Sequence, residues 1–248
     1  SALAANKLDI LNRTRPPVDN TYFDGSYGAA ALYECLPGIP FEEALRECLR
    51  SSVPHGDPSM STEVIRALSL ILCRILVDVS VKVVPRPPNN TVDHKSVANA
   101  LQEYCTINKM PNLLRHAKEE SRQRTDTESY GHRSDSWERL ALHVKTYMNS
   151  IFRLRASGDN DDVNNSSDDK AMRLLGSNSS AVVGVKAASV RYMIGILCYF
   201  ATEILTCSWE LVEGEGRDRL ELADVKNTIV LDEELKYMNV KLCLQTGY

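Results

Sequence analysis

The residue types that could support catalysis or hold a metal ion are scattered along this chain. Its five histidines form neither an H-x-x-x-H nor an H-E-x-x-H group, the spacings that place two imidazoles on one helix face. Its seven cysteines include no C-x-x-C pair, the spacing typical of zinc sites and redox motifs. No glycine-rich loop follows a predicted strand. We therefore expect no enzyme active site, no cofactor and no bound metal.

The cysteines also indicate the compartment. Cys73 and Cys198 fall within apolar helical runs, where a free thiol behaves as a small hydrophobic side chain. An odd number of scattered cysteines predicts a reducing, intracellular setting without a disulfide framework. Residues 2–10 are too short and too polar for a signal peptide. The longest apolar run, 64–84, is interrupted by charges and is not expected to span a membrane.

The elements that position the remaining polar residues are expected to be helices. Aromatic residues make up 6% of the chain and only 12 of its 248 residues are glycine, which disfavours a many-stranded protein. The β-branched stretch 75–84 could suggest a strand, but the unbroken helical spacing upstream favours a helix that ends at Pro85. Apolar spacing predicts helices over 41–50, 61–84, 92–104, 111–122, 137–155, 188–212, 222–230 and 232–238.

The stretches between these helices are polar. We expect an irregular N-terminal arm over 1–40, with one short helix near 29–35. Residues 123–136 lack an apolar period and are predicted to be a linker. Residues 158–180 are rich in Asp, Asn and Ser and predict an exposed acidic loop.

Two distant stretches, 57–104 and 185–238, share one pattern. Each predicts a short helix and loop, a long apolar helix, a second loop and a second short helix. One such unit cannot bury its long helix alone, whereas two can pack against each other. The order is typical of the histone fold, written twice in one chain.

Specific segments carry a resemblance to core histones. Ser189–Leu205 (SVRYMIGILCYFATEIL) resembles the start of the long helix of histone 2A, and Asp232–Leu235 resembles its DEEL signature. Met60–Val79 resembles the long helix of histone 2B, and Asn112–Ala117 the start of its C-terminal helix. The whole is similar to the histone 2B–2A doublets of giant viruses of the Marseillevirus type, in a shorter variant form.

The resemblance implies an all-α fold in which two tandem histone folds form an intramolecular handshake heterodimer. The 2B-like fold would cover residues 41–122 and the 2A-like fold residues 137–248, with the acidic loop 158–180 as an insertion. A docking tail over 239–248 would be cut short. The departures from the family are that residues 1–40 do not resemble its lysine-rich tail and that the first unit's second loop is several residues shorter.

The same resemblance implies DNA contacts where the first loop of one unit meets the second loop of the other. Arg219 matches the loop arginine that histone 2A inserts into the minor groove. Ser61 and Thr62 match paired hydroxyls at the start of the 2B long helix, although helix capping alone also explains them. A solvated surface role is the alternative for each cation. The expected DNA-binding residues are Arg219, Arg217, Lys186, Arg153, Arg155, Ser61, Thr62 and Arg86.

A second implied surface is the acidic patch to which nucleosome-binding partners anchor arginines. Cys198 and Thr206 stand where the family has acidic residues, so the patch would be weakened. The alternative is that its carboxylates only cap and solvate helices. The residues that match the patch are Glu203, Asp232, Glu233, Glu234 and Glu120.

The net charge of −4 is unusual for a protein expected to wrap DNA. DNA affinity comes largely from phosphates neutralised by cations, so binding requires the cations to gather on one edge. Screening limits distant acids to about 8–10 Å of influence. We therefore expect wrapping that is weaker and more sensitive to salt than in an ordinary nucleosome.

These observations lead to one functional hypothesis and two alternatives. The leading hypothesis is a structural protein that binds double-stranded DNA, joins a histone 4–3 doublet and a second copy of itself, and compacts a viral genome in the viral factory or virion, with the host nucleus as another possible site. A regulatory histone-fold dimer that does not wrap DNA is the first alternative. The second is an assembly chaperone or decoy, which shares the support of the acidic loop and would bind histones without DNA.

Overall fold

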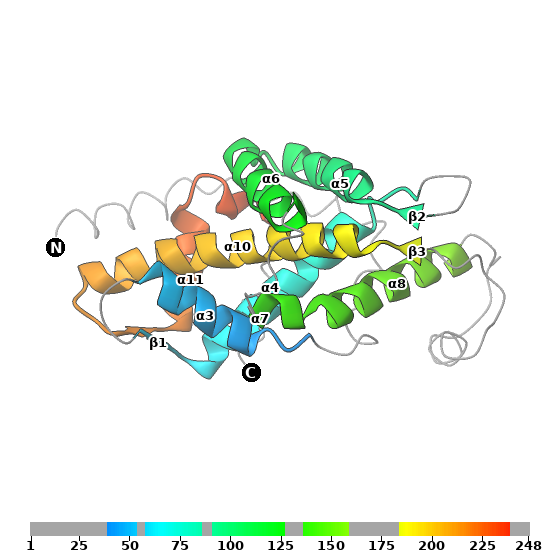
Figure 1. The fold of residues 1–248 in the computed structure, drawn as a ribbon. Coiled ribbons are helices and arrows are strands. Elements are labelled where there is room, and N and C mark those ends of the chain that lie inside the picture. Colours follow the sequence, from blue (N-terminus) through cyan, green and yellow to red (C-terminus); the bar gives the residue numbers. More distant parts are fainter. Residues whose placement is uncertain (1–38, 54–57, 86–90, 127–135, 159–183, 239–248) are drawn as a thin grey trace, which may run out of the picture. The chain divides into compact units, whose positions relative to one another are not determined.

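Two long apolar helices, one from each half of the chain, organise the structure (Figure 1). The computed structural model describes residues 39–53, 58–85, 91–126, 136–158 and 184–238. All of them belong to one compact unit, residues 36–248. The described part is mostly helical, with only two short strand pairs, so the predicted all-α class is confirmed.

In the first half, the described residues form four helices and two short strands. Its long helix α4 begins directly after β1, and Pro111 occupies the first position of the last helix, where its missing N–H costs nothing. The elements are α3 (Glu42–Ser52), β1 (Ser59–Met60), α4 (Thr62–Ser80), β2 (Thr91–Val92), α5 (His94–Ile107) and α6 (Pro111–Asp126).

The second half repeats this order with a longer central helix. The region 137–155, predicted as one helix, is broken at Leu140, whose N–H bonds the carbonyl of Trp137 at 3.1 Å. The elements are α7 (Ser136–Arg139), α8 (Ala141–Gly158), β3 (Gly184–Val185), α10 (Ala187–Gly214), β4 (Arg219–Leu220), α11 (Leu222–Leu231) and the 3₁₀ turn η2 (Leu235–Tyr237).

The strands join the two halves at two places. β1 pairs in parallel with β4, with Ser59 opposite Arg219. β2 pairs in parallel with β3, with Thr91 opposite Gly184. Because β3 precedes α10 and β4 follows it, the two pairs lie towards opposite ends of that helix (Figure 1). Each pair therefore brings a loop of one half beside a loop of the other.

The core lies around α10, which contacts helices of both halves: α3, α4, α5 and α6 from the first, and α7, α8 and α11 from the second. Its closest neighbour is α6. A Cβ added at Gly195 would lie 2.5 Å from the Cα of Ser121, so only glycine permits this approach. The side chains of Leu68, Leu72, Leu76, Leu101, Met193, Leu197, Phe200 and Ile204 are fully buried.

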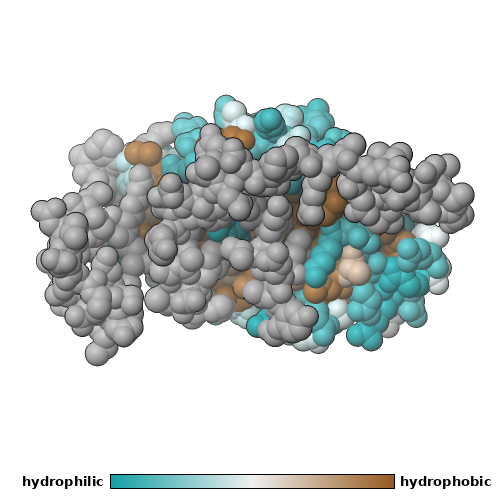
Figure 2. Space-filling view, turned by 180° about the vertical axis from the view of Figure 1, so that it is seen from behind, coloured by the Kyte–Doolittle hydropathy of each residue, from teal (hydrophilic) through white to brown (hydrophobic). Residues whose placement is uncertain are grey.

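Among the described helices, α10 is the one that meets the length and composition criteria for a membrane span. Most of its apolar window is buried inside the unit, as expected for a core helix. On the face shown in Figure 2, hydrophilic side chains make up most of the described surface, and small apolar areas lie between them.

Several predicted boundaries differ from the structure. The linker prediction over 123–136 is wrong at its start, because α6 continues to Asp126. The helix predicted over 232–238 is also wrong, since only the 3₁₀ turn forms there. Asp232 Oδ1 accepts the N–H groups of Glu234 and Leu235, at 2.9 and 2.7 Å, and so competes with helical hydrogen bonding. The arm over 1–38, the acidic loop 159–183 and the tail 239–248 lie outside the described residues.

Candidate nucleic-acid interface

Each strand pair is a place where two helices begin. At the β1–β4 edge, α4 starts after β1 and α11 starts after β4. At the β2–β3 edge, α5 starts after β2 and α10 starts after β3. The first turn of a helix has N–H groups without helical partners and carries a partial positive charge. Two such ends side by side can bind a phosphate if cations accompany them and carboxylates do not occupy them.

The hydroxyls at the β1–β4 edge differ in their surroundings. Ser61 is 2% exposed, and its Oγ accepts the N–H of Val64 at 3.4 Å, so it caps α4. Its own N–H bonds the carbonyl of Leu220 across the strand pair at 3.1 Å. Thr62, in contrast, is exposed. Of the two predicted hydroxyls, Thr62 is the one that solvent or a phosphate can reach.

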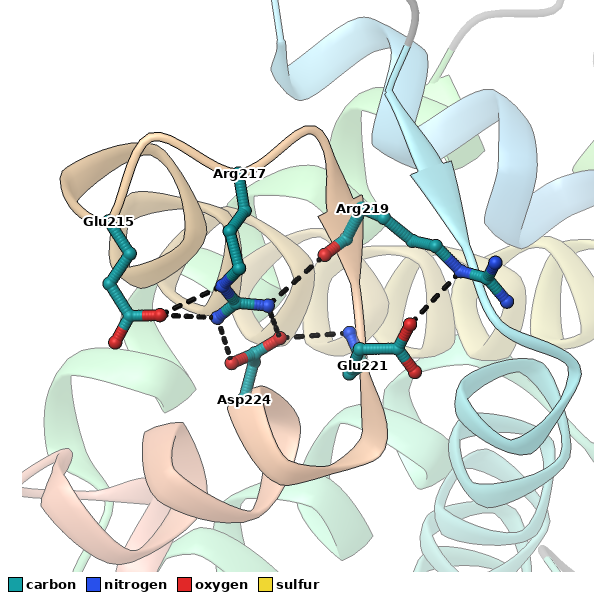
Figure 3. A network of polar contacts seen from close by, with 5 residues as sticks. All are labelled: Glu215, Arg217, Arg219, Glu221 and Asp224. Carbon is teal, nitrogen blue, oxygen red and sulfur yellow. Dashed lines mark hydrogen bonds and ion pairs between the residues drawn. The ribbon is translucent and has the colours of Figure 1, made fainter.

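Arg217 is held inside its own loop (Figure 3). Its guanidinium donates to both oxygens of Asp224, at 2.6 and 3.0 Å, and to Glu215 at 2.8 Å. A further hydrogen bond of 3.3 Å reaches the carbonyl of Arg219. Burial would raise the pKa of Asp224, but the hydrogen bonds from Arg217 and from the N–H of Glu221 outweigh it and hold that pKa below its usual value. Arg217 therefore stabilises the loop with most of its donors.

Arg219 points away from this cluster (Figure 3). Its side chain is 59% exposed, and Nε lies 3.0 Å from Glu221 Oε1. An ion pair this exposed contributes little and opens easily. Asp218, also exposed, lies beside it in the sequence. A phosphate that approached Arg219 would therefore compete with nearby carboxylates for its guanidinium.

The β2–β3 edge has a different balance of charge. Lys186 is exposed at the start of α10, and no side chain caps that helix. Its backbone N–H bonds the carbonyl of Val92 at 3.2 Å, which fixes it beside the start of α5. Lys95, in the first turn of α5, is exposed as well. The carboxylate of Asp93 is engaged with the N–H and hydroxyl of Ser96, at 2.8 and 3.0 Å. This edge thus combines two exposed ammonium groups with an uncapped helix.

Lys95 was not among the residues expected from the sequence. The histone resemblance implied arginines, two helix-start hydroxyls and Lys186, but not Lys95. The available signal was its place in the first turn of a helix that directly follows a predicted loop. Such a position puts a cation beside the helix N-terminus, where an anion would bind.

Three further arginines, Arg153, Arg155 and Arg86, were predicted to bind DNA. Arg153 is exposed on α8. The side chain of Arg155 and all of Arg86 lie outside the described residues. Within the described parts of the chain, no group of three or more His, Cys, Asp or Glu residues could hold a metal ion.

Two residues of the predicted acidic patch cap backbone groups. Glu234 accepts the N–H groups of Asn112 and Leu113, at 3.0 and 2.8 Å, and so caps α6 of the first half. Asp232 caps the 3₁₀ turn, as described above. Both carboxylates remain only partly exposed. Their main contacts are structural, as the capping alternative supposed.

The remaining acidic residues are spread over neighbouring elements. Burial raises the pKa of Glu203, against the effect of a hydrogen bond from Tyr199, and Asp232 and Glu210 raise it further. Glu233 is exposed and pairs with Lys236 at 2.8 Å. Glu120 pairs with Arg124 at 2.9 Å. Glu203 and Asp232 are thus close enough to interact, whereas Glu120 is engaged by a neighbouring cation.

No protein-family model matches the chain, and no curated protein matches it.

Proposed function

We propose that this chain is a tandem pair of histone folds of the 2B–2A doublet type. In this proposal it binds double-stranded DNA without sequence preference and, with a histone 4–3 doublet and a second copy of itself, wraps viral DNA into a nucleosome-like particle. The observation that carries the proposal is the strand pairing. Both pairs join a loop of one half to a loop of the other, in parallel and at opposite ends of α10.

The chemistry of the β2–β3 edge supports a contact with phosphate. Lys95 and Lys186 are both exposed there, and the start of α10 lacks a side-chain cap. Lysine and helix N–H groups recognise the phosphate backbone and carry no base information. Binding through this edge would therefore be insensitive to sequence and would weaken steeply with salt.

Two exposed apolar side chains, one after the end of α4 and one at the end of α5, support docking of a partner protein. Val84 is 67% exposed beyond the end of α4, and Ile107 is 59% exposed at the end of α5. The ion pair between Lys82 and Glu103, at 2.8 Å, holds these two ends together. Large apolar side chains that are exposed beside charged residues are candidates for a protein interaction site. We propose that the 4–3 doublet docks here.

The test is reconstitution of the full chain with the partner doublet and DNA, followed by nuclease digestion. We expect a discrete protected DNA fragment. Ile107→Glu should abolish assembly, whereas Leu142→Glu, at an exposed leucine on α8, should not. A digest without any discrete fragment would contradict the proposal.

One observation favours a second function. Both arginines at the β1–β4 edge are paired with carboxylates, and Asp218 adds a further negative charge. A regulatory histone-fold dimer that contacts proteins and does not wrap DNA would have no need for free cations there. It predicts a stable complex with a protein partner and no protected DNA in the same digestion.

A further inference from the structure

Two buried cysteines, one from each half of the chain, meet where α3 packs on α10. Cys48 on α3 is 5% exposed and Cys198 on α10 is 7% exposed. Their thiols are close enough to form a hydrogen bond with each other. Thr202, one helical turn after Cys198, donates to Cys48 Sγ at 3.5 Å, which places Cys48 against the same turns of α10.

The surroundings of the two sulfur atoms are more polar than those of an ordinary core cysteine. Trp137 Nε1 donates to Cys48 Sγ at 3.2 Å, and Arg124 Nη2 donates to Cys198 Sγ at 3.3 Å. Donors and a guanidinium favour a thiolate over a thiol. The hydrogen bond from Cys198 lowers the pKa of Cys48, and Thr202, Trp137 and Arg124 add to this effect against burial. The pKa of Cys198 is raised, first by that same hydrogen bond and then by burial.

We propose that Cys48 and Cys198 are a redox-modification site, which forms a disulfide between α3 and α10 on reaction with a low-molecular-weight disulfide of the glutathione type. The Cys48 thiolate attacks one sulfur of that disulfide, forms a mixed disulfide and releases one thiolate. The released thiolate takes the proton of Cys198, and the Cys198 thiolate attacks Cys48 Sγ. This expels the second small molecule as a thiolate, which takes up the proton that Cys48 had lost. The two protein thiols are oxidised, and the small disulfide is reduced to two thiols.

The bond would join the halves independently of the chain between α6 and α7. In the thiol form, α3 and α10 are held together by packing and hydrogen bonds. In the disulfide form a covalent bond also joins them. Such a cross-link between distant residues restricts the unfolded chain and so stabilises the folded one. The inference does not depend on DNA binding, so it can fail or succeed separately from the proposed function.

The test incubates the full chain with oxidised glutathione, blocks the remaining thiols and maps tryptic peptides without reductant. We expect the peptide Glu47–Arg50 to be linked to Tyr192–Arg217, and the link to disappear with dithiothreitol. Because the second peptide also contains Cys207, the Cys207→Ser variant is the matched control and should form the same link. Cys48→Ser and Cys198→Ser should each abolish it.

A second measurement uses the natural chain alone, so that it does not depend on the folding of a variant. Oxidation should raise the midpoint of thermal unfolding, and reductant should return it to the starting value. If Cys48 and Cys198 are still alkylated as free thiols after oxidation, or if either pairs with a different cysteine, the inference is overturned.

Discussion

The guanidinium of Arg217 donates hydrogen bonds to both carboxylate oxygens of Asp224, at 2.6 and 3.0 Å, and so ties the loop after α10 to the first turn of α11. The same carboxylate accepts the N–H of Glu221 at 2.8 Å, which completes a capping box. One buried acidic group thus holds both the loop and the helix start. The side chain of Arg219, two residues after Arg217, does not contact Asp224 and is 59% exposed.

We expect Arg217→Ala to lower the free energy of unfolding clearly more than Arg219→Ala does, because it leaves the buried Asp224 carboxylate without its charged donor. Urea unfolding measures the change. Arg219→Ala is the matched control in the same loop, and its effect should stay below about 0.5 kcal/mol because its ion pair is exposed.

The stability of the fold should depend on pH through Asp224. Since the pKa of Asp224 is lowered on folding, the contribution of its carboxylate to stability is present above the pKa of the unfolded carboxyl and is lost as pH falls through the folded value. Asp224→Asn should reduce this loss of stability in acid, and an unchanged acid dependence would contradict the assignment.

Lys186→Ala should weaken DNA binding by a similar factor for every sequence and should reduce the slope of log affinity against log salt by about 0.9, the value for one phosphate contact. Binding titrations at several salt concentrations measure it. Lys118→Ala, a substitution on α6 away from both strand pairs, should leave the slope unchanged. Equal slopes for Lys186→Ala and the unmodified chain would show that Lys186 does not contact a phosphate.

Arg219→Ala should shorten the DNA protected from nuclease or lower the salt concentration at which protection is lost. The reason is that its exposed guanidinium can exchange Glu221 for a phosphate. Glu221→Gln should act in the opposite direction, because it removes the competing charge. If Arg219→Ala leaves protection unchanged in length and in salt resistance, the β1–β4 edge does not contact DNA through this residue.

Gly195→Ala should destabilise the fold by about 1–3 kcal/mol, since the new methyl group would meet the backbone of Ser121 and force α6 away from α10. Gly214→Ala is a control at the end of the same helix, where an added Cβ meets nothing within 4 Å. That variant should be more stable by about 0.5–1 kcal/mol, because alanine loses less backbone freedom on folding. Denaturant midpoints of the two variants should therefore move in opposite directions.

Lys109 links α5 to α6 with a φ of 54°, a left-handed conformation that favours glycine. We expect Lys109→Gly to be more stable than Lys109→Ala by about 1 kcal/mol. The comparison isolates the backbone, because both variants lose the contact of the ammonium group with Tyr237, 5.8 Å from the ring centroid. Thermal unfolding measures the stability of both variants. Equal stabilities would contradict the expected backbone strain at Lys109.

The sequence was most informative about the helices. Apolar spacing located α4 and α10 to within a few residues, because a buried helix must repeat its apolar positions over many turns. The division at Leu140 and the 3₁₀ turn after α11 were not predicted. Both depend on competition for backbone hydrogen bonds, and apolar spacing does not report that competition.

The candidate interface was only partly predictable. Sequence order placed Lys186 and Arg219 next to helix starts, and both are exposed there. It could not show that Arg217 would be occupied by Asp224, or that Glu234 would cap a helix of the other half. Those contacts join residues whose proximity exists only after the halves have packed together.

The parallel strand pairs also have a consequence for synthesis on the ribosome. β1 finds its partner only when β4 has been translated, and β2 must wait for β3. Until then the apolar surface of α4 that α10 and α11 cover has nothing to pack against. Completion of the native state is therefore postponed until α10, β4 and α11 have been translated, and the nascent first half is the species that holdase chaperones would engage.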